Sequence, residues 1–568
     1  MNNRSYQVNG LIAASLIVFG LSLFPRFVEI GRFLPQYAID ENDIVEFGVG
    51  FMGGDLNPRW HGYGPLYAYL LGSVYYLQSF FSEQTYDAFV QDVFFNGSSF
   101  YYTARFINSL VIVAIAGVSF LFARRHFGIR TASITLLLLA FPFIDRLVAF
   151  SIRVDVLLGL WSLLLVSMST RLTETNALRY YVWSGLFTGL GLATKPLTGL
   201  LGLPVILGAH LIAVFRSVDQ KEDVGDALET SHSSGIPLMA RKLMSVFGSR
   251  QFYSRLFLFV GSVVMANAIA NPYSIMDFSS FVAQQKEQYQ ANAAMPQVTG
   301  ADFAMLFKPL GAPFVLTGLL ALLYGAWTAL RQRNPARLVG VILPVTYVAT
   351  FWNEPVRPHF YVPVIPIVAV YIGVLLDDLC IRAEKRGHGN SKISALLAVC
   401  ILCLVLLPGI SQVNRTLKLA LFSDDVQSHT CLASKNWIEN NLPAGSSVLL
   451  LGYAASLPKL VDPDDIRQAN IGEYFMYYRK HSPFLSYHFR QAHSKYVSLG
   501  RPTFRLENIR KLSQHDKDRL SLYCRARGIQ YVVSQYHLGE VGGFAVERAF
   551  LRATQPFGPE LWVYKVVI

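Results

Sequence analysis

The stretch YAIDENDIVEFG, residues 37–48, gathers four carboxylates in a chain whose formal net charge is +12. A carboxylate within hydrogen-bond reach of a hydroxyl group can remove its proton during a reaction. We therefore take the adjacent Asp40 and Glu41 as candidates for chemistry, and predict that Asp43 and Glu46 lie on the solvated side of the helix that follows. The alternative for Asp40 is a capping role, because a helix dipole favours acids in its first turn.

Further charged or polar residues stand at the ends of apolar segments, and these are Arg105, Arg153, Asp155, Lys195, Asn271, Arg357 and His359. A charge within a membrane span costs about 2.5–3.5 kcal/mol on insertion scales, and less at a helix end. With eleven membrane spans and the N-terminus in the cytosol, all of these residues lie on the non-cytosolic side of the membrane. This arrangement indicates a polar site in which cations hold a phosphate and carboxylates do chemistry.

Each of these residues also has a purely structural interpretation. Asp155 could pair with Arg153 or Arg146 at the interface, and Lys195 could extend its charge to the interface from the end of a span. Asn271 precedes Pro272, a sequence that often stops a helix. Arg357 and His359 could be ordinary loop residues.

The composition indicates a membrane protein. The chain is 52% hydrophobic and only 15% charged, whereas about a quarter of the residues of soluble proteins are charged. The chain shows no stripe of Lys and Arg interleaved with aromatic residues, so nucleic-acid binding is not expected. The basic excess is better explained by retention of cations on one side of a bilayer.

Eleven apolar segments are long enough, or nearly so, to span a membrane, and they lie near residues 9–25, 104–123, 131–150, 154–170, 180–194, 197–215, 256–273, 308–330, 338–352, 360–377 and 393–410. The Tyr-rich stretch 65–82 is taken as an interfacial helix. With the N-terminus in the cytosol, the arginine-rich links then fall on the cytosolic side, as the positive-inside rule requires.

The predicted fold is thus a polytopic α-helical membrane protein with about eleven spans, interfacial helices and a soluble α/β domain. Residues 1–410 form the membrane domain, with an outer loop at 26–103, and residues 411–568 form the domain outside the cytosol. Within the tail, WIENNLPAGSSVLLLGY predicts helix, turn and strand, RARGIQYVVSQ predicts a helix end followed by a strand, and ELWVYKVVI predicts a final strand.

Several segments follow one another in a fixed order along the membrane domain: DE after the first span, GPLYAYLL, ARFINSLVIV, ARRHFG, RVDVLLGLW, GLATKPLTGL, NPYSIMD and RPHFYVPVIPIVAVYIG. This ordered set resembles the polytopic glycosyltransferases of the GT-C fold, in particular the protein O-mannosyltransferase and aminoarabinose transferase superfamily. The resemblance covers roughly residues 1–410. It implies an enzyme that uses a polyprenyl-phosphate-linked sugar on the non-cytosolic face of a membrane.

The same resemblance implies roles for individual residues. Asp40 would be the catalytic carboxylate, with Glu41 beside it, and Asp155 a second acid of the site. Lys195 and Arg105 would face the donor phosphate, and Arg357 or His359 would close the site. Arg153 and Asn271 are additional candidates.

One position departs from the pattern of the superfamily. Some relatives have a charged residue just before the Pro-Leu of the interfacial helix, where this chain has Gly64. If that position binds phosphate or metal in relatives, His61 is the candidate to replace it here. A divalent metal therefore remains open, and no other cofactor is assigned beside the polyprenyl-phosphate sugar.

Two other functions are compatible with a polytopic membrane protein that has a charged outer site. A secondary transporter would carry intramembrane charges and inverted repeats, and no repeat is evident. A ligase or polymerase of lipid-linked glycans would share the cation-rich outer site. The acceptor can be a protein hydroxyl, a lipid or a glycan, and the membrane is expected to be a bacterial plasma membrane with the site facing the periplasm, or else an endoplasmic reticulum with a lumenal site.

Overall fold

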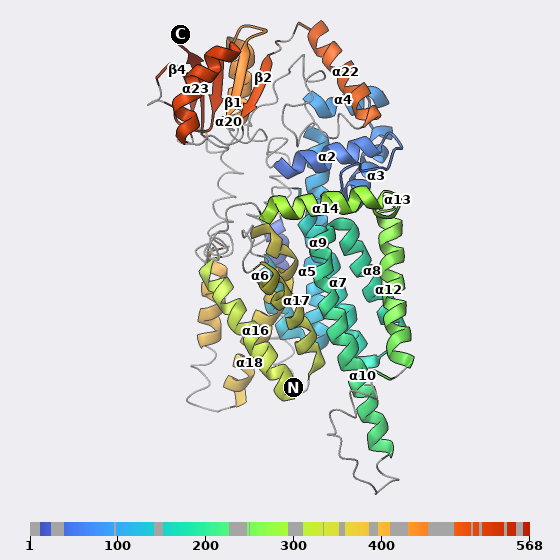
Figure 1. Ribbon diagram of the computed structural model, residues 1–568. Coiled ribbons are helices and arrows are strands. Elements are labelled where there is room, and N and C mark those ends of the chain that lie inside the picture. Colours follow the sequence, from blue (N-terminus) through green and yellow to red (C-terminus); the bar gives the residue numbers. More distant parts are fainter. Residues whose placement is uncertain are drawn as a thin grey trace.

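The computed structural model shows a helical bundle with a small sheet beyond one of its ends (Figure 1). It describes residues 12–23, 39–95, 98–140, 152–225, 247–248, 250–293, 311–332, 334–351, 358–385, 396–408, 410, 430–451, 482–500, 502, 504–509, 514–538, 542–551 and 560–567. Each of the eleven predicted spans overlaps a helix in these residues. The chain is an integral membrane protein.

Six helices are long and apolar enough to cross a membrane by length and composition, and they cover Ser99–His126, Val154–Thr175, Pro196–Ser217, Arg250–Ala270, Ala312–Gln332 and His359–Arg382. Four shorter apolar helices cover Ile12–Leu23, Ile129–Ala140, Arg337–Phe351 and Leu396–Pro408. The bundle comprises α5 (Ser98–His126), α6 (Ile129–Ala140), α7 (Val154–Thr175), α8 (Leu178–Thr194), α9 (Pro196–Gly199), η2 (Leu200–Gly202), α10 (Leu203–Gly225), α12 (Arg250–Ala270), α16 (Ala312–Gln332), α17 (Pro335–Phe351), η4 (Pro358–Val364) and α18 (Ile365–Lys385). The predicted number of eleven spans stays a prediction.

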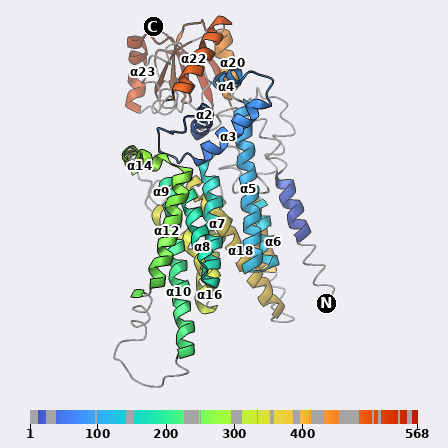
Figure 2. The ribbon, with the colours of Figure 1, turned by 90° about the vertical axis from the view of Figure 1, so that its right-hand side faces the viewer.

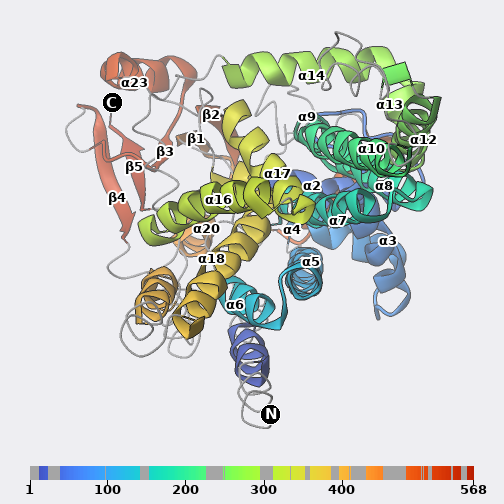
Figure 3. The same ribbon diagram turned by 90° about the horizontal axis from the view of Figure 1, so that it is seen from below.

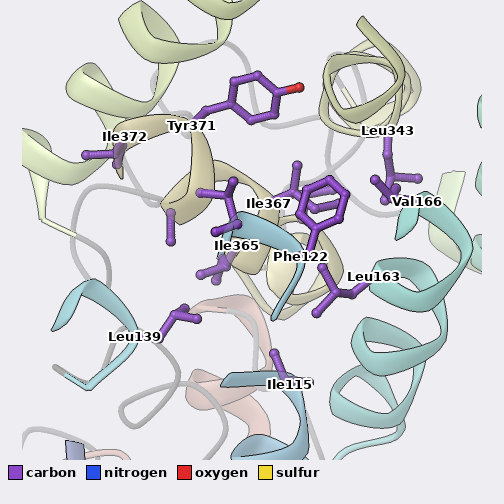
Figure 4. Close-up of a cluster of buried hydrophobic side chains, with 14 of the residues drawn as sticks. Ile115, Phe122, Leu139, Leu163, Val166, Leu343, Ile365, Ile367, Tyr371 and Ile372 are labelled. Carbon is purple, nitrogen blue, oxygen red and sulfur yellow. The ribbon is translucent and has the colours of Figure 1, made fainter. Parts of the chain in front are cut away.

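The bundle packs around an apolar core that draws side chains from helices far apart in the sequence. Seen along the bundle from below, α7, α8, α10 and α12 lie side by side on one flank, while α16 and α18 lie on the other (Figure 3). Side chains of α5, α6, α7, α17 and α18 meet between them (Figure 4), among them Ile115, Phe122, Leu139, Leu163, Val166, Leu343, Ile365, Ile367, Tyr371 and Ile372. This packing holds the ends of α5, α7 and α8 in fixed positions relative to one another.

A second group of helices covers one end of the bundle, and it comprises α2 (Ile39–Phe51), α3 (Leu66–Phe80), α4 (Tyr86–Phe95), α13 (Tyr273–Met276) and α14 (Phe278–Ala293). Helices α2 and α14 lie across the bundle: they are seen from the side in Figure 1 and end-on in Figure 2. Helix α3, which covers most of the predicted interfacial stretch 65–82, has 15 residues and packs against α2 at this end.

The C-terminal part forms the α/β structure predicted from its sequence. Its sheet has the order β2-β1-β3-β5-β4, and it lies beyond the end of the bundle that carries α2 (Figures 1 and 2). The strands are β1 (Ser447–Leu451), β2 (Arg505–Ile509), β3 (Tyr531–Ser534), β4 (Phe544–Phe550) and β5 (Leu561–Val566). Strand β1 pairs in parallel with β2 and β3, whereas β5 is antiparallel to β3 and β4.

Two helices accompany this sheet, α20 (Thr430–Asn441) and α23 (Gln514–Arg527). The predicted helix, turn and strand in WIENNLPAGSSVLLLGY correspond to α20 and β1. Gly528 ends α23 with a backbone φ of +66°, a conformation that glycine adopts without steric cost. The boundary between the two domains near residue 410 stays a prediction.

The C-terminal part also contacts the outer helices through α22 (Pro483–Ser498), which packs on α2 and α4. Leu485, Phe489 and Ala492 belong to the same buried cluster as the apolar residues of α2. His488 Nε2 lies 3.9 Å from Asp87 Oδ1 on α4. Helix α22 therefore forms part of the layer that holds α2 in place.

We expect Gly53→Ala to loosen this contact, because a Cβ at Gly53 would lie 2.4 Å from Cγ of Phe484. Forcing an extra methyl group into a packed site costs about 1–3 kcal/mol. Hydrogen exchange of residues 483–498 should accelerate in the variant. Phe484→Ala removes the clashing ring, so the double variant should exchange no faster than Phe484→Ala alone; additive effects would contradict the packing described here.

Candidate active site

The first buried ion pair joins Glu41 in the first turn of α2 to Arg105 on α5. Arg105 Nε and Nη2 donate to Glu41 Oε1 and Oε2 at 3.1 and 2.9 Å, and the two side chains are 1% and 0% exposed. The planar guanidinium matches the two carboxylate oxygens, which makes this geometry strong and directional. The backbone N–H of Ile152 also donates to Glu41 Oε1 at 2.9 Å. Glu41 thus ties α2 to α5 and to the residues that lead into α7.

The remaining acids of α2 do not lie where the sequence predicted. Asp43 and Glu46 are 6% and 1% exposed, so their predicted place on a solvated face is wrong. The reason is that α2 is covered on several sides, by α3, α4, α5 and α22. Both carboxylates take part in interactions with their surroundings. Asp40 lies in the first turn of α2, and its side chain is outside the described residues.

The second buried ion pair joins Lys195 to Asp155. Helix α8 ends at Thr194, Lys195 is extended with φ −151°, and Pro196 opens α9. Lys195 Nζ lies 2.7 Å from Asp155 Oδ1, which belongs to the first turn of α7. The ammonium group also lies 4.4 Å from the ring centroid of Phe360.

The two ion pairs are connected through one short segment. Ile152 donates its N–H to Glu41, and Asp155, three residues later, binds Lys195. Three residues span at most about 10 Å, so both pairs lie close together at the end of the bundle covered by α2. All four charged residues were candidates from the sequence, and the structure brings them into two acid–base pairs.

The loop before α3 closes onto the Lys195 segment. The N–H of Gly64 donates to the carbonyl of Thr194 at 3.1 Å, and the Tyr63 ring centroid lies 5.8 Å from Lys195 Nζ. A Cβ at Gly64 would lie 1.9 Å from the carbonyl oxygen of Ala193. This close approach leaves room only for glycine at this position.

His61 belongs to the same loop, and its ring is buried against α14 through an edge contact with Phe281. Its Nε2 lies 3.7 Å from Asp277 Oδ2. Burial lowers the pKa of His61, and the neighbouring Asp277 carboxylate raises it by less, so that the pKa lies below the ordinary value of 6.5. The imidazole is therefore neutral near pH 7 and poorly suited to hold a phosphate by charge.

The other predicted residues lie around these pairs or outside the described part. Arg153 is the residue before α7 and is half-buried. Asn271 is buried between α12 and α13, where it follows the last residue of α12, in agreement with a helix stop. His359 lies in η4, with its ring 4.8 Å from that of Phe360. Arg357 is outside the described residues.

The residues that hold this loop in place were not predicted from the sequence. Gln284 accepts a hydrogen bond from the His61 N–H at 2.7 Å, and Gln285 donates to the His61 carbonyl oxygen. These partners are separated from the loop by more than two hundred positions, with 224 between His61 and Gln285. No local spacing pattern could have paired them.

The structure does not support a metal site among the residues that it describes. No group of three His, Cys, Asp or Glu side chains comes together there. The Glu41 and Asp155 carboxylates are instead bound to Arg105 and Lys195.

Comparisons with known proteins bear on the fold and on one segment of the sequence. Residues 89–222 match the family model described as dolichyl-phosphate-mannose-protein mannosyltransferase. No curated protein matches this sequence. The archaeal oligosaccharyltransferase AglB from Archaeoglobus fulgidus, solved with an inhibitory peptide and a dolichol-phosphate, is similar with a TM-score of 0.50 and 13% identity, over 92% of this chain and 69% of that chain.

Two other solved structures cover nearly all of this chain. ArnT from Cupriavidus metallidurans bound to undecaprenyl phosphate aligns over 99% of this chain and 98% of that chain, with 16% identity and a TM-score of 0.47. The arabinofuranosyltransferase AftD from Mycobacteria aligns over 98% of this chain and 42% of that chain, with 13% identity and a TM-score of 0.42. The fold predicted from the sequence is confirmed: the chain has the GT-C fold, and its residues 89–222 match the model of the dolichyl-phosphate-mannose-protein mannosyltransferase family.

Proposed function

We propose that this protein is a membrane glycosyltransferase that moves a sugar from a polyprenyl-phosphate-linked donor to an acceptor hydroxyl. The observation that carries the proposal is the pair of buried ion pairs, Glu41–Arg105 and Asp155–Lys195, joined through residues 152–155 at one end of the bundle. The mannosyltransferase match over residues 89–222 supports it, because this segment contains Arg105, Asp155 and Lys195. The dolichol-phosphate bound to AglB supports a lipid phosphate as the donor.

The chemistry is a single displacement at the anomeric carbon. The acceptor oxygen bonds to that carbon while the bond to the phosphate oxygen breaks, and the polyprenyl phosphate leaves. Asp40 acts as the general base and takes the proton of the acceptor hydroxyl, a common role for a carboxylate. This assignment follows the position of Asp40 in the first turn of α2, one residue before the fixed Glu41.

The cations stabilise the charge that develops on the leaving phosphate. Lys195 is assigned this role, because its ammonium group stands at a helix junction beside the aromatic faces of Tyr63 and Phe360. Asp155 holds Lys195 in place. His359, next to Phe360, and Arg357 are assigned to the closure of the site.

Arg105 has a second role in this proposal besides contact with the donor phosphate. Its bidentate bond to Glu41 fixes the start of α2. Arg105 and Glu41 therefore act mainly as positioning residues for Asp40. Arg153, which precedes α7, and Asn271, which follows α12, complete the polar surroundings of the site.

We assign the site to the non-cytosolic side of a bacterial plasma membrane. The arginine-rich end of α5, with Arg124, Arg125 and His126 in its last turn, is the end opposite to α2 (Figure 1), and positive residues are retained in the cytosol. The C-terminal sheet then lies on the same side as the site. The acceptor is a protein, lipid or glycan hydroxyl.

A donor panel tests the proposed function. Purified protein in lipid nanodiscs is incubated with polyprenyl-phosphate sugars that differ in the sugar, and donor consumption is followed with hydroxyl acceptors of each class. We expect consumption of at least one donor, with release of polyprenyl phosphate. Donors that all stay intact, with protein shown to be folded, would speak against a glycosyltransferase.

Lys195→Met should reduce kcat/KM for the lipid donor by about tenfold or more, because removing a charge-assisted contact to phosphate costs about 1.5–3 kcal/mol. Removing Lys195 alone also leaves Asp155 buried without its cation, which destabilises the fold. The control is Lys195→Met combined with Asp155→Leu, which removes both charges. If Lys195 serves only the ion pair, the double variant regains donor kinetics; a persistent donor defect supports phosphate binding.

A further inference from the structure

His61 combines a backbone held by hydrogen bonds with a buried ring whose nitrogens have no hydrogen-bond partner among the described residues. Its backbone is held on both sides, by Gln284 and Gln285 of α14. Its side chain is 1% exposed, yet neither ring nitrogen has a hydrogen-bond partner among the described residues. Buried polar atoms are normally hydrogen-bonded, and leaving one without a partner is costly. The fold therefore presents an imidazole in a fixed place with its hydrogen-bonding capacity unused.

Asp277 determines which nitrogen of this imidazole is available. Its Oδ2 lies 3.7 Å from Nε2, at the junction between α13 and α14. Asp277 is the charged group that acts on the His61 ring in the described structure. A carboxylate facing one ring nitrogen favours the tautomer with the proton on that nitrogen. In this tautomer Nδ1 keeps its lone pair and can accept a hydrogen bond.

The loop that carries His61 also reaches the cation of the proposed site. Three residues further along the loop, Gly64 donates to Thr194, the neighbour of Lys195, and Tyr63 lies over the Lys195 ammonium group. Three residues reach at most about 10 Å. The loop that carries the His61 ring thus also closes onto the Lys195 segment.

We propose that His61 binds a substrate hydroxyl of this reaction, with Nδ1 accepting its hydrogen bond and Asp277 fixing the tautomer. The hydroxyl belongs to the donor sugar or to the acceptor. The proposal rests on the proposed function, and it replaces the phosphate or metal role suggested by the sequence. A neutral hydrogen-bond acceptor on the loop that closes onto the Lys195 segment suits a sugar, which presents hydroxyls on the carbon atoms beside its reacting centre.

Three variants of His61 test the proposal by steady-state kinetics with a donor found in the panel. His61→Leu removes both nitrogens and should lower kcat/KM by about tenfold, the loss expected for one buried hydrogen bond. His61→Asn places an amide oxygen near the position of Nδ1 and should restore most of this loss, whereas His61→Gln, whose amide is near Nε2, should not. A rise in the KM for the donor alone assigns the hydroxyl to the sugar, and a rise in the KM for the acceptor assigns it to the acceptor.

The pH dependence of kcat/KM distinguishes a hydrogen-bonding role of His61 from a role in packing alone. Protonation of Nδ1 removes the acceptor, so kcat/KM should fall as the pH drops through the pKa of His61. Asp277→Asn removes the negative charge that raises this pKa, so the acidic limb should move to lower pH. In His61→Asn the part of this limb that belongs to His61 should disappear, and the part that belongs to the proposed base Asp40 should remain.

Two outcomes would overturn the inference without touching the proposed function. One is wild-type kcat/KM in His61→Leu, and the other is an acidic limb that is the same in wild type, Asp277→Asn and His61→Asn. A wild-type protein that consumes no donor at all would instead contradict the proposed function itself. The control variant Glu83→Gln changes an exposed acid on the same end of the molecule and should leave all parameters at their wild-type values.

Discussion

Replacement of Asp40 by asparagine should lower the rate of sugar transfer by about 10²–10⁴-fold, the usual contribution of a positioned general base. The amide keeps the size of the side chain but cannot take the proton of the acceptor hydroxyl. Because Asp40 stands in the first turn of α2 and Glu41 is fixed by Arg105 and Ile152, the substitution should leave the fold intact. Single-turnover measurements with bound donor would report the loss directly.

The competing role for Asp40 is that of a carboxylate in the first turn of a helix, which contributes about 0.3–1 kcal/mol to stability. That role predicts a small loss of stability with near-normal turnover. Asp40→Asn with near-normal turnover would therefore remove Asp40 from the mechanism. Glu83→Gln, an exposed acid outside the site, controls for the change of charge alone.

Much of the fold could be predicted because a membrane span requires a long apolar helix, which is readily recognised in a sequence. An apolar run about 20 residues long has to be a helix in a bilayer, and the distribution of Arg and Lys orients it. The C-terminal strands followed from local patterns, such as Gly528 between α23 and β3. The shorter apolar helices, such as Ile129–Ala140, show why the number of spans is harder to derive.

The candidate site could be predicted only as a set of residue types. Charges at the ends of spans identified Arg105, Asp155 and Lys195, but not which acid each cation binds. The prediction for Asp43 and Glu46 was wrong because helical spacing describes one helix and cannot foresee that other elements cover it on several sides. In this chain α22 covers α2, and its residues lie more than four hundred positions away in the sequence. Contacts between such distant segments leave no local pattern.

Arg105→Met should be strongly destabilising, because it leaves the Glu41 carboxylate without its cation in a place where it is 0% exposed. Breaking a buried ion pair by removal of one partner costs about 3–5 kcal/mol. The double variant Arg105→Met with Glu41→Leu removes both charges and should recover most of the lost stability. Denaturant titration of the three proteins in the same detergent would measure these differences.

The double variant also separates the two roles assigned to Arg105. If Arg105 and Glu41 position α2, the stable double variant should lose kcat, because α2 is no longer tied to α5 and Ile152, while its KM for the lipid donor stays near the wild-type value. If Arg105 instead contacts the donor phosphate, the KM for the donor should rise and kcat should change less. A double variant with both wild-type parameters would show that neither role holds, and that the ion pair serves the fold alone.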